Sequence, residues 1–433
     1  MAPKDRERGV FVPLDAIDSI ELSDKQIVLN IPKSQMITVK VALESEIVRN
    51  CALELERCKV SVSESTLMAF FIFTESALGS RSLWKTYLDS LPQLGSGALF
   101  FGAKELDLLK ATPLAKASEA KQRQLSKQYD CFANALHAWH SKQITDSMLS
   151  FERYKWAHFI VLSRAISLAS FAATAYSESC AVHEGCDRVL LPVLDMFNHS
   201  SSNPSARWLV EHDGSVSVQI CSRQAKRAPK INIDGVNYIE LCFSYGEKPN
   251  TEWLYEYGFV PMDNAHGAWP YLIEPAGSSE LVSVKLLWMQ ELGIAPRIML
   301  QDPGLHGHLS SVSRETMLAL CLEALDDTLD SCNADITGPV AIPKFPYFSI
   351  NGKLLVDDDD KLLAVPRLTK HALDRCISRL EDARSTMLAN IEASAAVNAS
   401  VHNYLASESK LLSRIIAKLK NLIRAGASEL YVM

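Results

Sequence analysis

Two stretches of the chain decide its fold: Leu190-Leu-Pro-Val-Leu-Asp-Met-Phe-Asn-His-Ser200 and Cys242-Phe-Ser-Tyr-Gly-Glu-Lys-Pro-Asn-Thr-Glu-Trp-Leu-Tyr-Glu-Tyr-Gly-Phe259. In the first, an apolar strand ends abruptly in an Asn-His-Ser turn. In the second, a strand ends at Tyr245-Gly246, and another Tyr-Gly pair follows at 257–258. Each stretch alone fits a buried strand followed by a polar turn or a short aromatic helix. The two in this order indicate a functional site, because buried strands rarely end on such residues without a reason.

Outward from these stretches, the pattern changes from strands to helices and back. Residues 9–12 and 26–32 are typical of short strands. From Ser63, a plausible N-cap, the spacing is helical in several segments as far as residue 176. Extended structure returns at 189–194, 206–210, 216–221 and 238–244. This order predicts a β-domain into which helices are inserted.

The last third of the chain, after about residue 265, has an almost wholly helical pattern. Three apolar stripes at helical spacing fall near residues 317–325, 373–391 and 412–423, and each can pack against the others. Prolines and a glycine cluster at 262–275, as expected of a domain boundary.

Composition excludes several classes of protein. The 44 Lys and Arg against 51 Asp and Glu give a net charge of −7, without the basic footprint of a nucleic-acid binder or a membrane tether. The N-terminus carries no apolar signal-peptide core, and the most apolar stretch, 158–176, is broken by Arg164. Ten cysteines without a Cys-x-x-Cys pair predict reduced thiols, no bound metal and an intracellular protein, in cytoplasm or nucleus.

Two weaker signals have plain structural explanations. Gly95-Ser-Gly97 resembles part of a dinucleotide loop, but no apolar strand precedes it and the third glycine is misplaced. A basic run lies between two expected strands and contains Arg223, Lys226, Arg227 and Lys230. It is expected to be a solvated hairpin loop, with contact to an acidic partner as the alternative.

The two deciding stretches resemble SET-domain protein methyltransferases of the Rubisco large-subunit lysine methyltransferase-like class. Asp195-Met-Phe-Asn198-His199-Ser200 is similar to that family's Asp-Met-x-Asn-His-Ser motif, and 245–259 is similar to its Tyr-Gly…Tyr-Gly-Phe segment. Fainter similarity covers most of the chain, including Arg8-Gly-Val-Phe11, Trp84…Tyr87-Leu…Leu91-Pro92 and Ser163-Arg164-Ala165.

The resemblance implies an α+β fold in two domains. Residues 1–265 would form a SET β-fold split by a helical insert at about 60–150, with its two motifs threaded together as in few other folds. Residues 266–433 would form an all-α substrate-binding domain of the Rubisco-methyltransferase type. The implied partner is a protein substrate docked on that helical domain, and the protein is expected to act as a monomer without nucleic acid or membrane.

The resemblance also implies a cofactor, S-adenosyl-L-methionine, and a catalytic residue, Tyr245, whose hydroxyl would orient the acceptor amine and polarise the methyl group. Asn198 and His199 would hold the cofactor, with Asp195 bracing their turn. Arg164 would bond the cofactor carboxylate, unless it only pairs with an acidic residue between helices. Further cofactor contacts are implied for Val28, Met196, Phe197, Tyr245, Gly258 and Phe259.

Lysine is the expected acceptor, in a pocket formed by Val193, Leu194, Ile166, Tyr257 and Phe259. A related subgroup that methylates histidine has Trp and Asn where this chain has Leu194 and Ile166. An apolar pocket would leave an imidazole N–H unpaired, at a cost of about 1–3 kcal/mol. The acceptor is therefore expected to be an amine on a linear stem.

Three departures from the family pattern keep other functions open. Few residues precede Gly9, Gln26 stands where an acidic residue is frequent, and Ile166 replaces a common aromatic. They allow a SET scaffold that has little affinity for the cofactor and only binds a protein partner. A protein-histidine methyltransferase is the other alternative.

Overall fold

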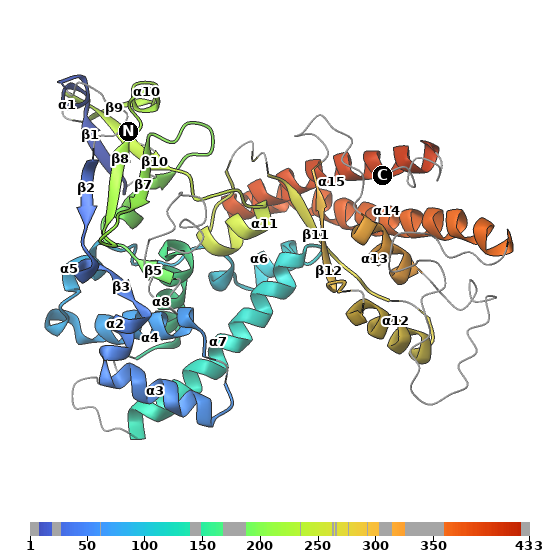
Figure 1. Ribbon diagram of the computed structural model, residues 1–433, viewed down its shortest axis with the longest axis horizontal. Helices are drawn as coiled ribbons and strands as arrows, with labels where there is room; N and C mark the ends of the chain where they lie inside the picture. Colours follow the sequence, from blue (N-terminus) through green and yellow to red (C-terminus); the bar gives the residue numbers. More distant parts are fainter. Residues whose placement is uncertain are drawn as a thin grey trace. The chain divides into compact units, whose positions relative to one another are not determined.

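The structure is a computed structural model of the 433-residue chain (Figure 1). It describes residues 8–19, 27–60, 62–138, 149–167, 188–233, 235–261, 264, 266–275, 277–291, 293–302, 314–324 and 359–425, so that Gln26 lies outside the described residues. The chain forms two compact units. The first contains 1–100, 118–247 and 255–258, and the second contains 101–117, 248–254 and 259–433. Residues 101–117, expected within the helical insert, thus group with the C-terminal unit.

The first unit contains three small sheets, with strand orders β1-β10-β6, β2-β8-β7 and β3-β5-β4, and β9 also pairs with β10. Their strands are β1 (Val10–Pro13), β2 (Ile27–Ile31), β3 (Ile37–Thr38), β4 (Ile166–Ser167), β5 (Arg188–Leu190), β6 (Asn198–His199), β7 (Ala206–Val210), β8 (Val216–Ile220), β9 (Lys230–Ile233) and β10 (Val236–Phe243). The strand expected at 189–194 is shorter than predicted. It ends at Leu190, and a 3-10 turn occupies Leu194–Met196.

The β core forms where these sheets meet. Strand β8 is central in its sheet and all five of its residues are buried, whereas the edge strand β2 exposes three of five. Val218 and Leu241 pack in one apolar cluster with Leu194 and Phe197. The cluster therefore fixes the strands that carry both deciding stretches.

A helical block lies between β3 and β4 in the sequence. Its helices in the first unit are α2 (Val39–Glu44), α3 (Glu46–Arg57), α4 (Glu64–Leu78), α5 (Lys85–Ser90), most of α7 (Pro113–Ala138) and α8 (Phe151–Arg164), and α1 (Leu14–Ser19) and α10 (Ser222–Ala225) lie outside the block. Ser63 caps α4 as predicted, since its hydroxyl accepts from the Thr66 N–H. The block begins well before residue 60, because the Thr38 hydroxyl caps α2 in a β-branched stretch that is typical of a strand.

Helices α4 and α8 pack around a second core that is rich in aromatic side chains. The ring of Phe70 stacks on Phe132 at 4.5 Å, and Phe73 meets Tyr154 edge-on at 5.6 Å. Helix α4 is buried from Met68 to Thr74, so it is apolar on every side rather than amphipathic. This core supports β3 and β5 from the helical side, through Ile37 and Leu190.

The second unit is mostly helical but is not all-α, so that part of the predicted fold was wrong. Strands β11 (Ala268–Leu272) and β12 (Arg297–Gln301) form an antiparallel pair in which Pro270 faces Met299. A two-stranded sheet has only edge strands, which tolerate a proline. The prolines near 270 suggested a linker, and that pattern hid the strand. The helices of this unit are α6 (Ala103–Leu108), α11 (Asn250–Glu252), α12 (Ser279–Glu291), α13 (Arg314–Ala324), α14 (Asp359–Ala395) and α15 (Ala399–Ala425).

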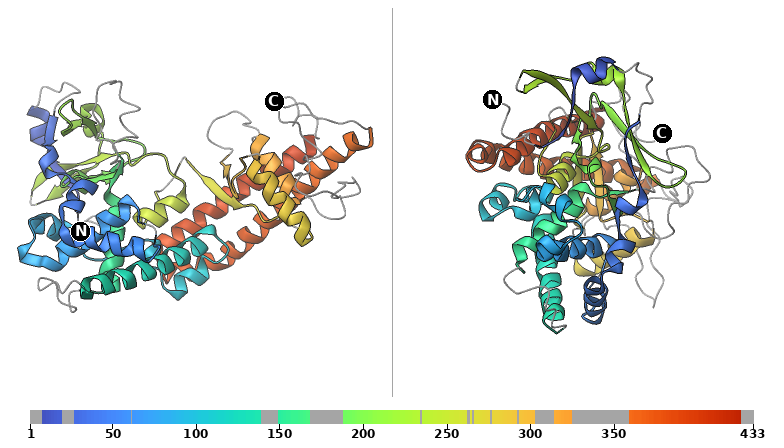
Figure 2. Two further views of the ribbon diagram at one scale, coloured as in Figure 1. Left: turned by 60° about the horizontal axis from the view of Figure 1, so that its bottom comes forward. Right: turned by 90° about the vertical axis from the view of Figure 1, so that its left-hand side faces the viewer.

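The two longest helices, α14 and α15, form the core of the second unit and lie side by side (Figures 1 and 2). Asn398 caps α15, because its side-chain oxygen accepts from the N–H groups of Ser400 and Val401. Leu373 and Leu412 are buried between the helices, as their stripes predicted. None of the helices in the described part of the chain has the length and apolar character needed to cross a membrane.

A buried polar network joins residues 248–254 to helix α15 within the second unit. Asn250 donates from Nδ2 to Glu408 Oε1 at 2.9 Å, and the hydroxyls of Thr251 and Tyr404 lie 3.2 Å apart. Glu408 is fully buried, and its Oε2 has no hydrogen-bond partner among the described residues. Burial raises the pKa of Glu408 to about 8, against the lowering effects of Asn250 and Arg414. The carboxyl is therefore mostly protonated at neutral pH.

Replacing Glu408 with Gln should stabilise the protein, and the gain should grow with pH. The carboxyl ionises near 4.5 when unfolded but stays protonated to about pH 8 when folded. The native protein therefore loses stability between these values, by about 1.4 kcal/mol per pH unit. Glutamine resembles the protonated acid and does not titrate. Thermal unfolding at intervals from about pH 5 to about pH 8 measures the difference, and a gain that does not change with pH would contradict a buried neutral carboxyl.

Candidate functional site

The two deciding stretches lie against each other in the first unit. Strand β6 runs parallel to the end of β10, with Cys242 opposite Asn198 and Phe243 opposite His199. Beyond this pairing, the Ser200 N–H donates to the Phe243 carbonyl at 3.1 Å. Parallel neighbours need a long connection, which here includes β7, β8 and β9. The two stretches therefore lie together in one hydrogen-bonded group.

Tyr245 lies directly after β10 and is held at both ends. Its hydroxyl donates to the Phe197 carbonyl at 2.6 Å, and its N–H donates to His199 Nδ1 at 3.1 Å. Its ring centroid lies 5.1 Å from that of Tyr257 and 5.2 Å from that of His199. Burial raises the pKa of Tyr245 well above its usual value, and neighbouring Tyr257 raises it further. The phenol therefore stays protonated and can orient or polarise a ligand, but it cannot act as a phenolate base near neutral pH.

His199 is also uncharged at neutral pH. Burial lowers its pKa to about 4, although a hydrogen bond with the Phe243 backbone acts in the opposite direction. Because Nδ1 accepts the Tyr245 N–H, the ring carries its proton on Nε2. The centre of the site is therefore made of neutral polar rings.

A charged group stands beside these rings. The carboxylate of Asp195 is fully buried, accepts the Tyr87 hydroxyl at 2.6 Å and lies 3.8 Å from the Arg164 guanidinium. Arg164 also donates to the Asp195 carbonyl and contacts the sulfur of Met196 at 3.8 Å. Burial raises the pKa of Asp195 to about 6, while Arg164 and the Tyr87 hydroxyl lower it. Asp195 thus links its turn to both Tyr87 and Arg164, and Arg164 has an acidic partner.

Asn198 joins the N-terminal strand to the site. Its amide Nδ2 donates to the Arg8 carbonyl at 2.9 Å and to the Glu240 carboxylate. A Cβ on Gly9 would lie 2.7 Å from Glu240 Oε1 and 3.1 Å from Asn198 Nδ2, so a larger residue before β1 would require these side chains to shift. The side-chain Oδ1 of Asn198 bonds to none of the described residues, which leaves it as an acceptor for a ligand.

The loop at 95–97 lies against the second deciding stretch, a contact that no sequence pattern predicted. Gly258 has φ +80°, and a Cβ there would lie 2.5 Å from Ser96 Oγ and 2.7 Å from the Gly97 nitrogen. The Ser96 hydroxyl also points at the Tyr257 carbonyl, at 3.5 Å. The glycine-containing loop that resembled a dinucleotide motif instead fits against the backbone of 257–258. The glycine at position 258 was the one sequence signal for this contact, because a glycine can mark a place where another backbone approaches closely.

The other predicted site residues are more scattered. Val28 lies on β2, in a different sheet from Asn198, at a bulge where its side chain is 41% exposed. Leu194 is fully buried in the β core, and Ile166 packs at the edge of that core. Phe259 belongs to the second unit, where its ring lies 5.5 Å from that of Trp253 at the start of the π-helical turn Trp253–Tyr257.

Val193 has an unusual backbone. Its φ of +76° is one that β-branched residues almost never adopt, and its side chain is 50% exposed. The strained residue starts the turn that buries Leu194 and Asp195, since the Met196 N–H donates back to the Val193 carbonyl. Strain at such a turn is typical of a site whose geometry the surrounding core enforces.

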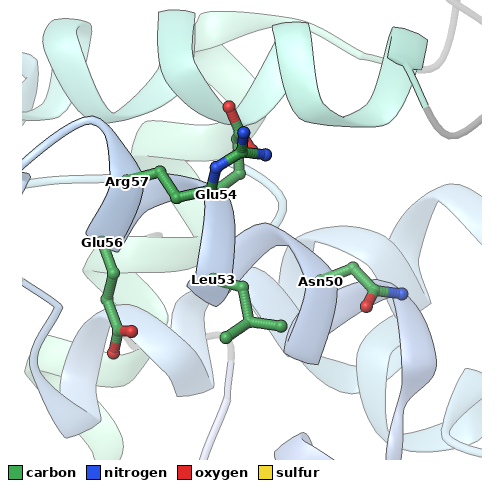
Figure 3. A pocket seen from close by; sticks show the side chains of 5 residues that line it. All are labelled: Asn50, Leu53, Glu54, Glu56 and Arg57. Carbon is green, nitrogen blue, oxygen red and sulfur yellow. The ribbon is translucent and has the colours of Figure 1, made fainter.

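A hollow on helix α3 is unrelated to this site. Its lining residues all come from that one helix, as Figure 3 shows. Glu54 and Arg57 form an exposed ion pair there, and Leu53 is 58% exposed. Among the described residues, no group of three or more His, Cys, Asp or Glu side chains is arranged to hold a metal ion.

Comparison with known proteins finds a SET domain-containing protein and protein methyltransferases among the relatives of this chain. No family model matches the sequence. The chain is 27% identical over 295 residues to SET domain-containing protein 4 of Mus musculus, covering 67% of this chain and 60% of that protein. Identity is 25% to Ribosomal lysine N-methyltransferase set10 of Schizosaccharomyces pombe (60% and 42% covered) and 25% to Actin-histidine N-methyltransferase of Drosophila melanogaster (56% and 43% covered). The chain thus spans less than two thirds of these relatives.

Solved structures give the fold. The crystal structure of the SET domain of LSMT bound to lysine and AdoHcy matches with a TM-score of 0.61 at 16% identity, covering 95% of this chain and 84% of that chain. The α+β class is therefore confirmed. The resemblance to SET-domain proteins of the Rubisco methyltransferase type, inferred from two short motifs, is confirmed as well.

Replacing Tyr87 with Phe should lower the free energy of unfolding by about 1–3 kcal/mol, because the buried Asp195 carboxylate loses a donor. Tyr154→Phe is the matched control. Tyr154 is also buried but donates at 3.3 Å to a neutral amide oxygen, Gln128 Oε1, so the loss of its hydroxyl should cost only about 0.5–1.5 kcal/mol. Denaturant unfolding at neutral pH compares the two, and equal losses would mean that Asp195 does not depend on the Tyr87 hydroxyl.

Proposed function

We propose that this SET-domain homologue is an S-adenosylmethionine-dependent protein methyltransferase that modifies a lysine side chain. One observation carries the proposal above all: the parallel pairing of β6 with β10 places the Asn198-His199 pair and Tyr245 in one hydrogen-bonded group. The related proteins named as methyltransferases and the cofactor-bound LSMT structures support the same reaction.

The residues present suit such a cofactor. Arg164 contacts Asp195 through Nη1 alone. Its Nε and Nη2 bond to none of the described residues, so they can donate to the cofactor's carboxylate. The open Oδ1 of Asn198 suits an ammonium group. When bound, the cofactor would supply an activated methyl group on a sulfonium. We further propose contacts from His199, Met196, Phe197, Gly258, Val28 and Phe259.

The chemical step needs a neutral amine. Methyl transfer is an in-line displacement in which the amine nitrogen forms the new bond while the carbon–sulfur bond breaks, so positioning does most of the work. With a lysine pKa near 10.4, deprotonation at pH 7 costs roughly 4–5 kcal/mol. The rings of Tyr245, Tyr257 and neutral His199 carry no negative charge that would stabilise an ammonium ion, and the sulfonium of a bound cofactor would disfavour a second positive charge. The protonated Tyr245 hydroxyl orients the amine through its lone pairs.

Lysine rather than histidine is the proposed acceptor, although relatives with both names occur. We propose that the acceptor pocket involves Val193, Leu194, Ile166, Tyr257 and Phe259. Leu194 and Ile166 are both apolar and packed with the core, so neither offers a group to pair with an imidazole N–H. An extended lysine stem makes no such demand.

A scaffold function without methyl transfer is the second candidate. Asn198 and Arg164 already have intramolecular partners, as residues of a purely structural site would. Calorimetric titration with S-adenosylmethionine separates the two functions, because a scaffold would give neither binding heat nor a thermal shift.

Tyr245→Phe should lower kcat by about 10²–10³-fold while leaving the affinity for S-adenosylmethionine close to normal. The hydroxyl acts on the amine and the moving methyl, so its loss is felt in the transition state. Asn198→Ala should instead weaken cofactor binding, with thermal unfolding recorded alongside because Asn198 also bonds to Glu240. A Tyr245→Phe enzyme within a few-fold of native activity would show that this tyrosine only packs.

The labelled product should be methyl-lysine. Transfer of labelled methyl groups into fractionated protein extract, followed by acid hydrolysis and mass spectrometry, distinguishes methyl-lysine from 3-methylhistidine. Recovery of 3-methylhistidine would overturn the acceptor assignment and leave the methyltransferase proposal standing.

A further inference from the structure

Four cations project from one short segment of the first unit. Arg223, Lys226, Arg227 and Lys230 are all exposed, on α10 and at the start of β9. None of them forms an ion pair with a residue that the structure describes. This is unusual in a chain whose net charge is −7. Arg207, whose side chain bonds Gln219, lies on the neighbouring end of β7 and is exposed as well.

The segment is a built turn rather than a loose loop. Ala225 is fully buried in the β core and Ala228 packs against that core, so the cations between and beside them face outward. Three backbone hydrogen bonds close the turn: the N–H groups of Ala225, Arg227 and Ala228 donate to carbonyls three or four residues earlier, at 2.9–3.1 Å. The positive charges are thus held on a fixed surface.

This basic turn is attached to the loop that leaves the candidate site. The Cys221 N–H donates to the Ser205 carbonyl at 2.8 Å, and Asn203 Nδ2 donates to the Gln224 carbonyl at 3.0 Å. Ser205 in turn donates through its N–H to the Cys242 carbonyl, beside Asn198 in the β6–β10 pairing. The turn and the site therefore share one hydrogen-bonded framework within the first unit.

We infer that the basic turn, residues 221–230, docks an acidic surface of the protein substrate beside the site. The inference rests on the proposed function and adds to it a class of substrate: proteins whose acceptor lies near a cluster of Asp and Glu. Exposed cations on a hydrogen-bonded turn attract such a cluster and accelerate its encounter. Nucleic acid is the poorer partner, since the segment has no aromatic residue for base stacking and the chain as a whole is acidic.

Charge reversal of the turn tests the inference on the full chain. The variant R223E/K226E/R227E is compared with the control K40E/K59E/K127E. The control reverses three exposed lysines, on α2, after α3 and on α7 in that order, with the same change in net charge. Lys230 is kept, because it lies on the edge strand β9, where lysine also prevents unwanted pairing. Fluorescence anisotropy with labelled poly-L-glutamate measures binding at low and at moderate salt.

The native protein should bind poly-L-glutamate, and binding should weaken as salt is raised. Reversal at the turn should weaken binding at least about tenfold, and the control should stay within about twofold. Equal losses in both variants, a turn variant that binds like the native protein, absence of native binding, or tighter binding of polyuridylate than of poly-L-glutamate would each overturn the inference.

Calorimetry with S-adenosylmethionine on the same proteins keeps the two proposals apart. The turn variant should bind the cofactor as the native protein does, because none of its changed residues is assigned to the cofactor. Native protein that binds poly-L-glutamate but no cofactor would refute the methyltransferase proposal and leave an acidic docking surface. Native protein that binds the cofactor but not poly-L-glutamate would refute the docking inference and leave the methyltransferase proposal standing.

Discussion

The site depends on a parallel pairing of only two residue pairs, between β6 and the end of β10. Sequence-distant strands rarely lie parallel on so short a contact, so other bonds must hold it in place. They come from Ser200 and Ser205, whose N–H groups donate to the carbonyls of Phe243 and Cys242, and from Tyr245, which bonds to Phe197 and His199. The same residues that would meet a ligand therefore close the fold around it.

The charged and the uncharged side chains of the site occupy different sides of the turn. The rings of Tyr245 and His199 remain uncharged, whereas Asp195 and Arg164 form an ion pair at the back of the same turn. A buried ion pair adds little stability by itself, but it fixes the geometry of the groups that it touches. Here it anchors the turn whose strained residue, Val193, leads into β6. Under the proposed function, the neutral rings would suit an uncharged nucleophile.

Much of the fold could be predicted because its signals are local. The Asn-His and Tyr-Gly stretches are linear motifs in a fixed order, and the stripes of α14 and α15 repeat at helical spacing. Features that depend on contacts between distant residues could not be predicted. The hydroxyl of Tyr87 on Asp195 and the loop at 95–97 against Gly258 each join residues that are more than a hundred positions apart. Strand β11 was missed for a different reason, because Pro270 argues against a strand unless its edge position is known.

The membership of residues 101–117 in the C-terminal unit has a consequence for how the chain can fold. Helix α6 lies in this segment, and the Leu108 carbonyl at its end accepts from Asn390 Nδ2 of α14 at 2.9 Å. During synthesis α6 leaves the ribosome long before α14 exists, so it must wait, without its partner, while most of the first unit is being completed. The two units are therefore not consecutive pieces of chain that could mature one after the other. A cut after 258 would leave the N-terminal fragment carrying a helix that belongs to the other unit.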